Sequence, residues 1–201
     1  MLKLVVLISG SGTNLQALLE ALEASQVTPS PIAARVVAIG ADSARANLTF
    51  ADELGIPTFV VNPADYDSRA SWGDALLEAV LQYQPDLTVL SGFMRLVPPR
   101  FVAALAPALL NTHPAYLPEF PGAHAVRDAL AASVTQTGAT IMIVDNGVDT
   151  GPIIDQVRIP IEPDDDEDSL HSRIKVAERK LLIDTVRGIA DGTINLEEIT
   201  A

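Results

Sequence analysis

The chain has 201 residues, of which 48% are hydrophobic and 19% are charged, so it fits one globular domain with a sizeable core. Its 26 acidic residues outnumber its 13 lysines and arginines, and the net charge of −13 argues against nucleic acid as a partner, because basic surfaces bind phosphate backbones. The absence of cysteine excludes disulfides, thiolate nucleophiles and cysteine-bound zinc.

The first half of the chain alternates strand and helix patterns. Leu2–Ile8 is apolar at every position except Lys3, a pattern typical of a central parallel strand buried on both faces. Asn14–Ser25 carries leucines at helical spacing and predicts a helix. The same criteria predict strands at Val36–Ile39, Thr58–Val61, Leu87–Leu90 and Leu109–Leu110, and helices at Ser43–Leu54, Ser68–Gln82 and Pro99–Leu105.

The second half has fewer alternations and ends in a long helix. The predicted elements are a short helix at Ala123–Ala132, strands at Ala139–Val144 and Ile153–Ile161, and a helix from about Ser169 to Ile189. The acidic run Asp164–Asp168 suits the N-terminus of that last helix, where negative charge interacts favourably with the helix dipole.

This order of elements predicts a single doubly wound, Rossmann-like α/β domain with a mostly parallel sheet, and ligands at the carboxyl ends of the strands. Within it, roughly residues 1–105 are expected to bind a phosphate or nucleotide. Residues 106–201 are expected to supply the catalytic half and to bind the second substrate.

Neither a membrane nor a metal is expected. No apolar run approaches the ~20 residues that span a bilayer. The apolar run in Met1–Ile8 is too short for a signal peptide, and no small-residue cleavage site follows it, which predicts a cytoplasmic location. His113, His124 and His171 are too widely spaced for a metal-ligand motif.

The segment Ser9–Asn14 links the first strand to the first helix. Gly10 and Gly12 let the backbone approach a ligand closely, and Thr13 and Asn14 are candidate caps of the helix. The free N–H groups of a helix N-terminus bind anions, so this loop is a candidate phosphate site. A tight turn with a good cap would require the same glycines, and that alternative stays open.

The loop differs from the dinucleotide-binding fingerprint. That pattern requires a third glycine where Leu15 stands, so the loop suits one phosphate better than a pyrophosphate. Asp42, which follows the second predicted strand, is nevertheless placed like an acid that binds a ribose, and it keeps a dinucleotide alternative open.

Asn111, His113 and Asp149 are the candidate catalytic residues. Acyl transfer needs a donor to an oxyanion, a base, and an acid that orients the base, and these three residues supply an amide, an imidazole and a carboxylate. With no cysteine and no nucleophile-elbow serine, the sequence indicates direct transfer between two bound substrates. Strand ends and turns also favour Asn and Asp, which is the structural alternative.

With these segments in order on one chain, the sequence resembles the phosphoribosylglycinamide formyltransferases, the folate-dependent enzymes of purine synthesis. The resemblance runs through nearly the whole chain. It rests on Leu7–Gln16, Ser91–Arg95, Asn111–Pro114, Leu117-Pro118, Phe120–His124 and Gly147–Ile154.

The resemblance implies a role for each matching residue. Asn111, His113 and Asp149 would be catalytic, and Glu178 would bind the ribose hydroxyls. The phosphate would be held by Gly10, Ser11, Gly12, Thr13 and Asn14. The folate would be bound by Arg69, Met94, Arg95, Leu96, Val97, Asp145 and Val148.

The implied reaction moves the formyl group of 10-formyltetrahydrofolate to the amino group of glycinamide ribonucleotide. The expected partners are these two small molecules, without nucleic acid, membrane or metal, and the expected assembly is a monomer or homodimer. The chain departs from the family pattern at Ala115, Glu119 and Met142, which bear on the shape of the pocket.

Three alternatives follow from the same residues. A methionyl-tRNA formyltransferase would carry an RNA-binding domain and a basic surface, and a formyltetrahydrofolate hydrolase would carry a regulatory domain; neither feature is expected here. A non-enzymatic sugar-phosphate binding module would explain the glycine-rich loop but would leave Asn111, His113 and Asp149 without a purpose.

Overall fold

The computed structural model describes residues 1–200, and a seven-stranded sheet runs through them in the order β3-β2-β1-β4-β5-β6-β7. The first five strands are parallel, and the last two join one edge in antiparallel orientation. The strands are β1 Leu2–Ile8, β2 Ala34–Ala41, β3 Thr58–Val60, β4 Leu87–Leu90, β5 Leu109–His113, β6 Gln136–Ile143 and β7 Ile153–Pro160.

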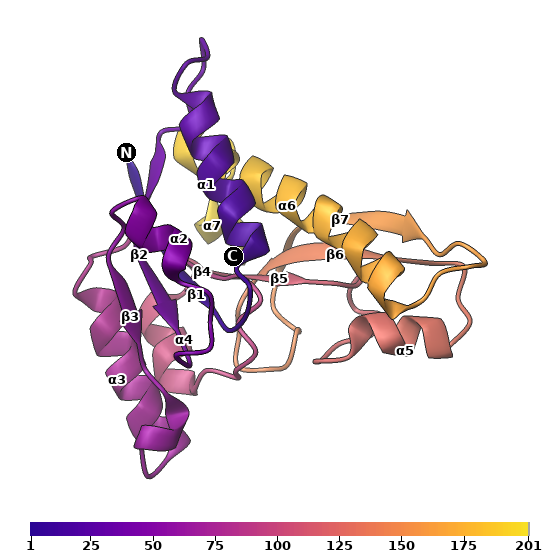
Figure 1. Ribbon diagram of the computed structural model, residues 1–201, viewed down its shortest axis with the longest axis horizontal. Coiled ribbons are helices and arrows are strands. Elements are labelled where there is room, and N and C mark those ends of the chain that lie inside the picture. Colours follow the sequence, from indigo (N-terminus) through magenta and orange to yellow (C-terminus); the bar gives the residue numbers. More distant parts are fainter. Residues whose placement is uncertain (201) are drawn as a thin grey trace.

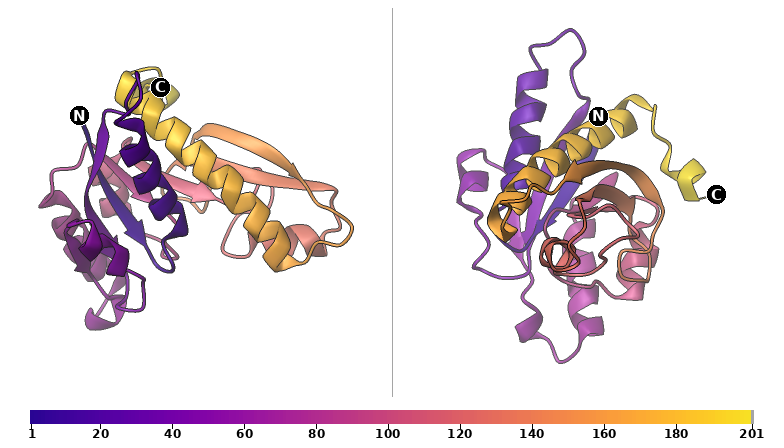
Figure 2. Two further views of the ribbon diagram at one scale, coloured as in Figure 1. Left: turned by 45° about the horizontal axis from the view of Figure 1, so that its top comes forward. Right: turned by 90° about the vertical axis from the view of Figure 1, so that its right-hand side faces the viewer.

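Helices cover both faces of this sheet, as expected of a doubly wound fold (Figure 1). α1 and α6 lie side by side on one face, and α3 and α4 lie on the other (Figures 1 and 2). The helices are α1 Thr13–Ser25, α2 Thr49–Glu53, α3 Arg69–Leu81, α4 Pro99–Leu105, α5 Ala125–Ala131, α6 Glu167–Asp191 and α7 Leu196–Thr200, with a 3₁₀ turn, η1, at Pro63–Asp65.

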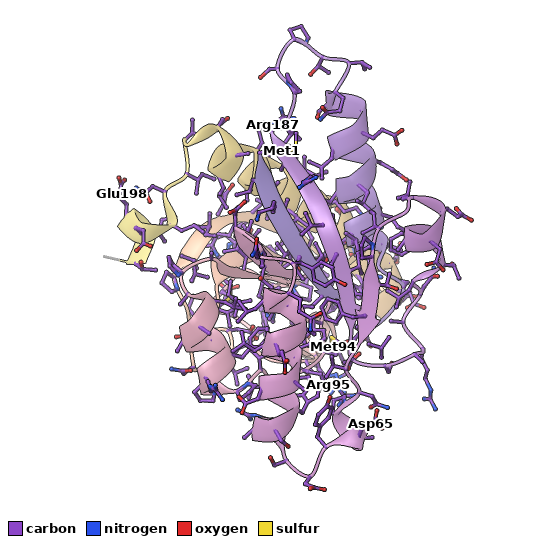
Figure 3. The ribbon with its side chains drawn as sticks, turned by 90° about the vertical axis from the view of Figure 1, so that its left-hand side faces the viewer. Met1, Asp65, Met94, Arg95, Arg187 and Glu198 are labelled. Atoms are coloured by element: carbon purple, nitrogen blue, oxygen red, sulfur yellow. The ribbon has the colours of Figure 1, made fainter. Side chains whose placement is uncertain are left out.

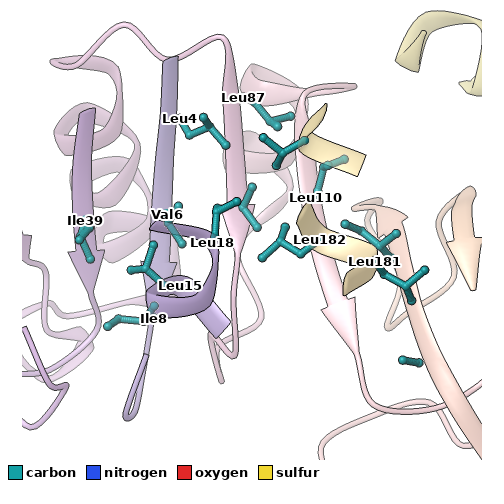
Figure 4. Close-up of a cluster of buried hydrophobic side chains, with 14 of the residues drawn as sticks. Leu4, Val6, Ile8, Leu15, Leu18, Ile39, Leu87, Leu110, Leu181 and Leu182 are labelled. Atoms are coloured by element: carbon teal, nitrogen blue, oxygen red, sulfur yellow. The ribbon is translucent and has the colours of Figure 1, made fainter. Parts of the chain in front are cut away.

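The apolar run of β1 is explained by burial on both faces. Leu4, Val6 and Ile8 pack into the cluster beneath α1 and α6, where Leu15 and Leu182 meet them (Figure 4). The alternate residues of β1 pack into the cluster on the side of α3 and α4. Because successive side chains of a strand point to opposite faces, the part of β1 that is buried on both faces, Leu4–Ile8, is apolar at every position, while Lys3 lies before it.

Several predicted elements are confirmed with their bounds. The strands Leu2–Ile8 and Leu87–Leu90 and the helix Pro99–Leu105 are observed as predicted. Ser68 caps α3, because its side chain accepts from the backbone N–H of Ser71 at 3.1 Å. The doubly wound, mostly parallel α/β class is also confirmed.

The predicted helix at Ser43–Leu54 is wrong over its first half, since α2 begins only at Thr49. The backbone N–H of Asn47 donates to the carbonyl of Gly10 at 3.0 Å. The Asn47 side chain accepts from the hydroxyl of Thr49 at 2.7 Å. These contacts tie the segment to the glycine-rich loop and give its backbone an alternative to helical hydrogen bonds.

The fifth strand is longer than its apolar part. It continues from the predicted Leu109–Leu110 to His113, because β6 pairs with it and sets Asn111 opposite Met142 and His113 opposite Thr140. Asn111 and His113 are therefore held in a strand of the sheet and not in a loop beyond it.

The C-terminal helix begins where the acidic run ends. Asp166 caps α6 by accepting from the backbone N–H of Ser169 at 2.8 Å, which confirms the capping role expected of this run. The helix ends at Gly192, whose φ is 80°. The turn η1 and the helix α7 were not predicted. None of the helices in residues 1–200 has the length and hydropathy needed to cross a membrane.

Candidate active site

A cleft of about 560 Å³ opens at the carboxyl ends of β1, β4 and β5. The loops that follow these strands form its floor, and the segments around Gly122–Val126 and Asp145–Asp149 and one face of α6 form its walls. Both halves of the chain line this one cleft. Met94–Val97, expected to bind folate, come from the first half, and Glu178, expected to bind ribose, comes from the second.

Asn111, His113 and Asp149 meet in this cleft. Asn111 Nδ2 donates to Asp149 Oδ1 at 3.4 Å, and His113 Nδ1 lies 3.4 Å from Asp149 Oδ2. His113 is 4% exposed, so its contact with Asp149 is largely shielded from water. The structure thus brings together three residues that the sequence separates by up to 38 positions.

The second ring nitrogen of His113 is also occupied. Nε2 lies 2.9 Å from the carbonyl oxygen of Phe120, and since a carbonyl only accepts, Nε2 must carry a proton in this contact. The backbone N–H of Gly122 donates to Asp149 Oδ2 at 2.8 Å. One short segment therefore fixes both the orientation of the His113 ring and the direction of the Asp149 carboxylate.

The Asp149 loop is tied down by its own side chains. Asp145 accepts from the backbone N–H of Gly147 and from the Thr150 hydroxyl, each at 2.9 Å. A Cβ atom on Gly151 would lie 2.0 Å from the carbonyl oxygen of Ile143, so glycine is required there. Asp149 itself has a φ of 53°, a conformation that Asp and Asn adopt more readily than most residues.

The first backbone N–H groups of α1 are left without a side-chain cap, whereas Thr13 and Asn14 were predicted to cap the helix. Gly12, with a φ of 67°, is the N-cap, and no side chain caps this helix. Thr13 and Asn14, the predicted caps, are instead its first two helical residues. Within α1 the first backbone bond runs from Gln16 to the carbonyl of Gly12, so the N–H groups before Gln16 are available to an anion.

Glu178 of α6 closes the other side of this loop. Asn14 Nδ2 donates to Glu178 Oε2 at 3.5 Å, and Arg179 Nε donates to Asn14 Oδ1 at 3.3 Å. Burial raises the pKa of Glu178 to about 7, against the hydrogen bond from Asn14 and the charge of Lys175, which lower it. A carboxylate that is 5% exposed in a polar cleft has the placement of a ligand-binding group.

The apolar members of the candidate folate residues form a wall of the cleft. Met94, Leu96 and Val148 are 62%, 47% and 50% exposed, an unusual exposure for such side chains. The backbone N–H of Met94 donates to Ser9 Oγ at 2.8 Å, which fixes this wall to the end of β1. Figure 3 shows Met94 and Arg95 together at the end of the sheet opposite Met1.

Arg69 is the one candidate site residue outside this arrangement. It is exposed at the start of α3, and the described residues that line the cleft do not include it. A role for Arg69 in folate binding therefore rests on the sequence resemblance alone.

Sequence reasoning missed several residues of the cleft. Glu167, His171 and Lys175 of α6 line it together with Glu178. Their spacing of four, four and three residues places them on one helix face, and that periodicity was the available signal. Burial and the neighbouring charge of Lys175 lower the pKa of His171. His124, at the start of α5, also lines the cleft.

The three departures from the family pattern have different surroundings. Met142 lines the cleft. Ala115 is fully buried, and its carbonyl accepts from the Thr140 hydroxyl at 2.7 Å. Glu119 forms two 2.7 Å hydrogen bonds with Arg158 and does not belong to the described cleft lining. Within residues 1–200 no cluster of three or more potential metal ligands is found.

Comparison with known proteins matches residues 2–186 to the formyl transferase family. The chain is similar to the phosphoribosylglycinamide formyltransferase of Mycobacterium tuberculosis, with 46% identity over 99% of this chain and 90% of that protein. It is 35% identical to the Escherichia coli protein of the same name, over 100% of this chain and 92% of that one. The crystal structure of glycinamide ribonucleotide transformylase 1 from Symbiobacterium toebii matches with a TM-score of 0.89 and 39% identity, over 96% of this chain and 89% of that one.

Proposed function

The chain belongs to the formyl transferase family, and from that premise we propose that it moves the formyl group of 10-formyltetrahydrofolate to the amino group of glycinamide ribonucleotide. It is a formyltransferase, and this reaction is the formyl transfer step of purine biosynthesis. The products are formylglycinamide ribonucleotide and tetrahydrofolate.

One observation carries the assignment of the catalytic residues. Asn111 Nδ2 and His113 Nδ1 converge on the carboxylate of Asp149, each at 3.4 Å. An amide N–H and a protonated imidazole that face one point in a shielded cleft are suited to an oxyanion. Both contacts are longer than an ordinary hydrogen bond, so the carboxylate does not hold either nitrogen tightly.

In the proposed mechanism, the amine of the ribonucleotide attacks the formyl carbon and forms a tetrahedral oxyanion. The Asn111 amide and the His113 ring stabilise that negative charge. Asp149 holds the ring in place through Nδ1 and takes part in moving the proton from the incoming amine to the folate nitrogen that leaves. No covalent enzyme intermediate is needed, because binding both substrates in one cleft supplies the proximity.

The substrates occupy opposite ends of the cleft in this proposal. The phosphate binds at Gly10–Asn14, where the first N–H groups of α1 are unpaired, and the ribose hydroxyls bind Glu178. The folate lies along Met94–Val97 and the loop that carries Asp145 and Val148. The exposed apolar side chains of this wall are suited to a flat ring system.

We further propose that the protein acts in the cytoplasm on these small molecules, as a monomer or homodimer.

The test is a spectroscopic assay of 10-formyltetrahydrofolate consumption with and without glycinamide ribonucleotide. Turnover is expected only when the ribonucleotide is present. Equal turnover with water alone would indicate a hydrolase, and formylation of methionyl-tRNA at a comparable rate would overturn the proposed substrate.

A further inference from the structure

Asp42 is a buried acidic residue that the proposed mechanism leaves without a role. It follows β2 directly, at the same end of the sheet as the cleft, and it is 3% exposed. In a dinucleotide-binding protein, the acid at this position is open to the ribose. Here Asp42 is buried, and the described residues that line the cleft do not include it.

Asp42 is paired with the side chain of Arg95. Arg95 Nε donates to Asp42 Oδ2 at 2.5 Å, while Oδ1 of the same carboxylate is buried and has no partner among residues 1–200. A buried carboxylate needs a compensating charge, and removal of its partner is strongly unfavourable. The two residues therefore hold each other in a fixed arrangement.

The other end of Arg95 belongs to the cleft. Its side chain is 50% exposed and lies between Met94 and Leu96 in the apolar wall. Neither terminal nitrogen, Nη1 or Nη2, makes a hydrogen bond within the described part of the chain. The guanidinium thus uses Nε for the buried acid and keeps two terminal groups for a ligand, in the planar geometry that suits an oxygen acceptor.

We propose that Asp42 is a positioning residue that acts on the binding of the folate co-substrate through Arg95. The buried carboxylate fixes the guanidinium, so that Nη1 and Nη2 are already placed to donate to acceptor oxygens of the bound folate. This inference rests on the proposed function, because it takes the wall at Met94–Val97 as the folate subsite. It assigns Asp42 no contact with either substrate.

The test is direct titration of tetrahydrofolate, followed by steady-state kinetics. Asp42→Ala frees the guanidinium, and ordering one long side chain on binding weakens an interaction by roughly three- to tenfold. We expect the folate Kd and KM to rise by that factor while the ribonucleotide KM and kcat stay close to the wild type. Asp42→Asn retains an oxygen acceptor for Nε and should recover part of the folate affinity. This variant also tests the inference if Asp42→Ala does not fold.

A matched control is the exposed pair Arg100–Asp74, joined at 2.9 Å between α4 and α3. Asp74→Ala removes an aspartate from an arginine in the same way but outside the cleft, and it should leave both KM values unchanged. In an Arg95→Ala background, Asp42→Ala should weaken folate no further, because Asp42 acts through Arg95.

Two results would overturn the inference: an unchanged folate Kd in folded Asp42→Ala, or a loss of folate affinity on Asp42→Ala that is the same with and without the Arg95 side chain. The folate titration contains no ribonucleotide, so its result does not depend on whether glycinamide ribonucleotide is the formyl acceptor. A tetrahydropteroate without its glutamate tail locates the contact. If the effect of Asp42→Ala vanishes with this ligand, Arg95 binds the tail carboxylates, and if it persists, Arg95 binds an oxygen of the ring system.

Discussion

Asp149 accepts from the backbone N–H of Gly122 at 2.8 Å with the same oxygen that faces His113 Nδ1 at 3.4 Å. The hydrogen bond from Gly122 fixes the carboxylate, and the longer distance to His113 leaves the carboxylate within reach of the ring. Because the Gly122 N–H holds the carboxylate, Asp149 can orient the imidazole and stabilise its charge without moving closer to it. The other side of the ring is held by the Phe120 carbonyl, so His113 has little freedom to turn.

Replacement of Asn111 or His113 by alanine should lower kcat far more than substrate binding, because the best interactions of both side chains form at the oxyanion. Each loss should be about 10²-fold or greater, as for other oxyanion donors. The double variant should lose less than the product of the two single losses, since both groups act on one charge. Steady-state kinetics measures this, and a near-normal kcat in either single variant would remove that residue from the mechanism.

Asp149→Asn should preserve the fold and most of the ribonucleotide affinity but depress kcat strongly. Asparagine tolerates the φ of 53° at this position and keeps the size of the side chain, but it removes the charge opposite His113. The limb of the pH–rate profile that reports His113 should shift as well. Profiles of kcat against pH test this; if both proteins give the same rates and profiles, Asp149 is a turn residue only.

Gly12→Val should raise the KM for the ribonucleotide and leave folate binding nearly unchanged. A Cβ atom at Gly12 would lie 3.2 Å from both Ile8 Cδ1 and Phe50 Cε1, and its φ of 67° is unfavourable for valine. The side chain would therefore displace the backbone N–H groups that are proposed to bind the phosphate.

Gly55→Val is the control for backbone strain in that experiment. Gly55 has a φ of 64° and nothing within 4 Å of an added Cβ, and it ends the segment after α2, away from the described cleft lining. It should reduce stability without changing the KM for the ribonucleotide. Weaker folate binding by Gly12→Val, with the ribonucleotide spared, would mean that the two subsites are reversed.

Glu178 should make the protein less stable as the pH rises from about 4.5 to about 7. Burial raises the pKa of Glu178 from 4.5 to about 7, so the folded protein holds this proton more tightly than the unfolded chain does. The free energy of unfolding then falls between these two pH values, by roughly 3 kcal/mol at about 1.4 kcal/mol per pKa unit.

Glu178→Gln removes that ionisation, so above pH 7 the variant should unfold at a higher temperature than the wild type, while near pH 4.5 the two should be similar. The KM for the ribonucleotide should rise, because the proposed ribose acceptor loses its charge. Thermal unfolding from pH 4.5 to 8.5 measures the first effect. Parallel stability curves for the two proteins would show that Glu178 is not perturbed by burial.

Glu119→Gln provides a comparison of opposite sign. The hydrogen bond to Arg158 lowers the pKa of Glu119, so its contribution to stability is present above pH 4.5 and is lost as the pH falls further. At neutral pH this variant should therefore be slightly less stable than the wild type. If Glu119→Gln instead raises stability as Glu178→Gln is expected to, burial is not the reason for the rise at Glu178.

The sequence by itself determined the α/β class and the chemical nature of the site. Burial on both faces makes the central strands predominantly apolar, so β1 and β4 could be located to the residue. The Ser9–Asn14 loop could be located because a strand, a glycine-rich turn and a helix follow one another without interruption. Asn111, His113 and Asp149 supply the functional groups of acyl transfer, and their residue types suggest this before any geometry is known.

Tertiary structure decided which of these groups meet. The helix predicted at Ser43–Leu54 begins only at Thr49, because the backbone N–H of Asn47 bonds to Gly10, a contact across 37 residues that no local propensity contains. Asp42 follows its strand as a ribose-binding acid would, but it is 3% exposed, and the loop after β4 brings Arg95 to pair with it. The pKa of Glu178 likewise depends on burial against a helix that begins 165 residues earlier. Such pairings depend on the order of strands in the sheet and on the paths of the loops, which periodicity and local motifs do not specify.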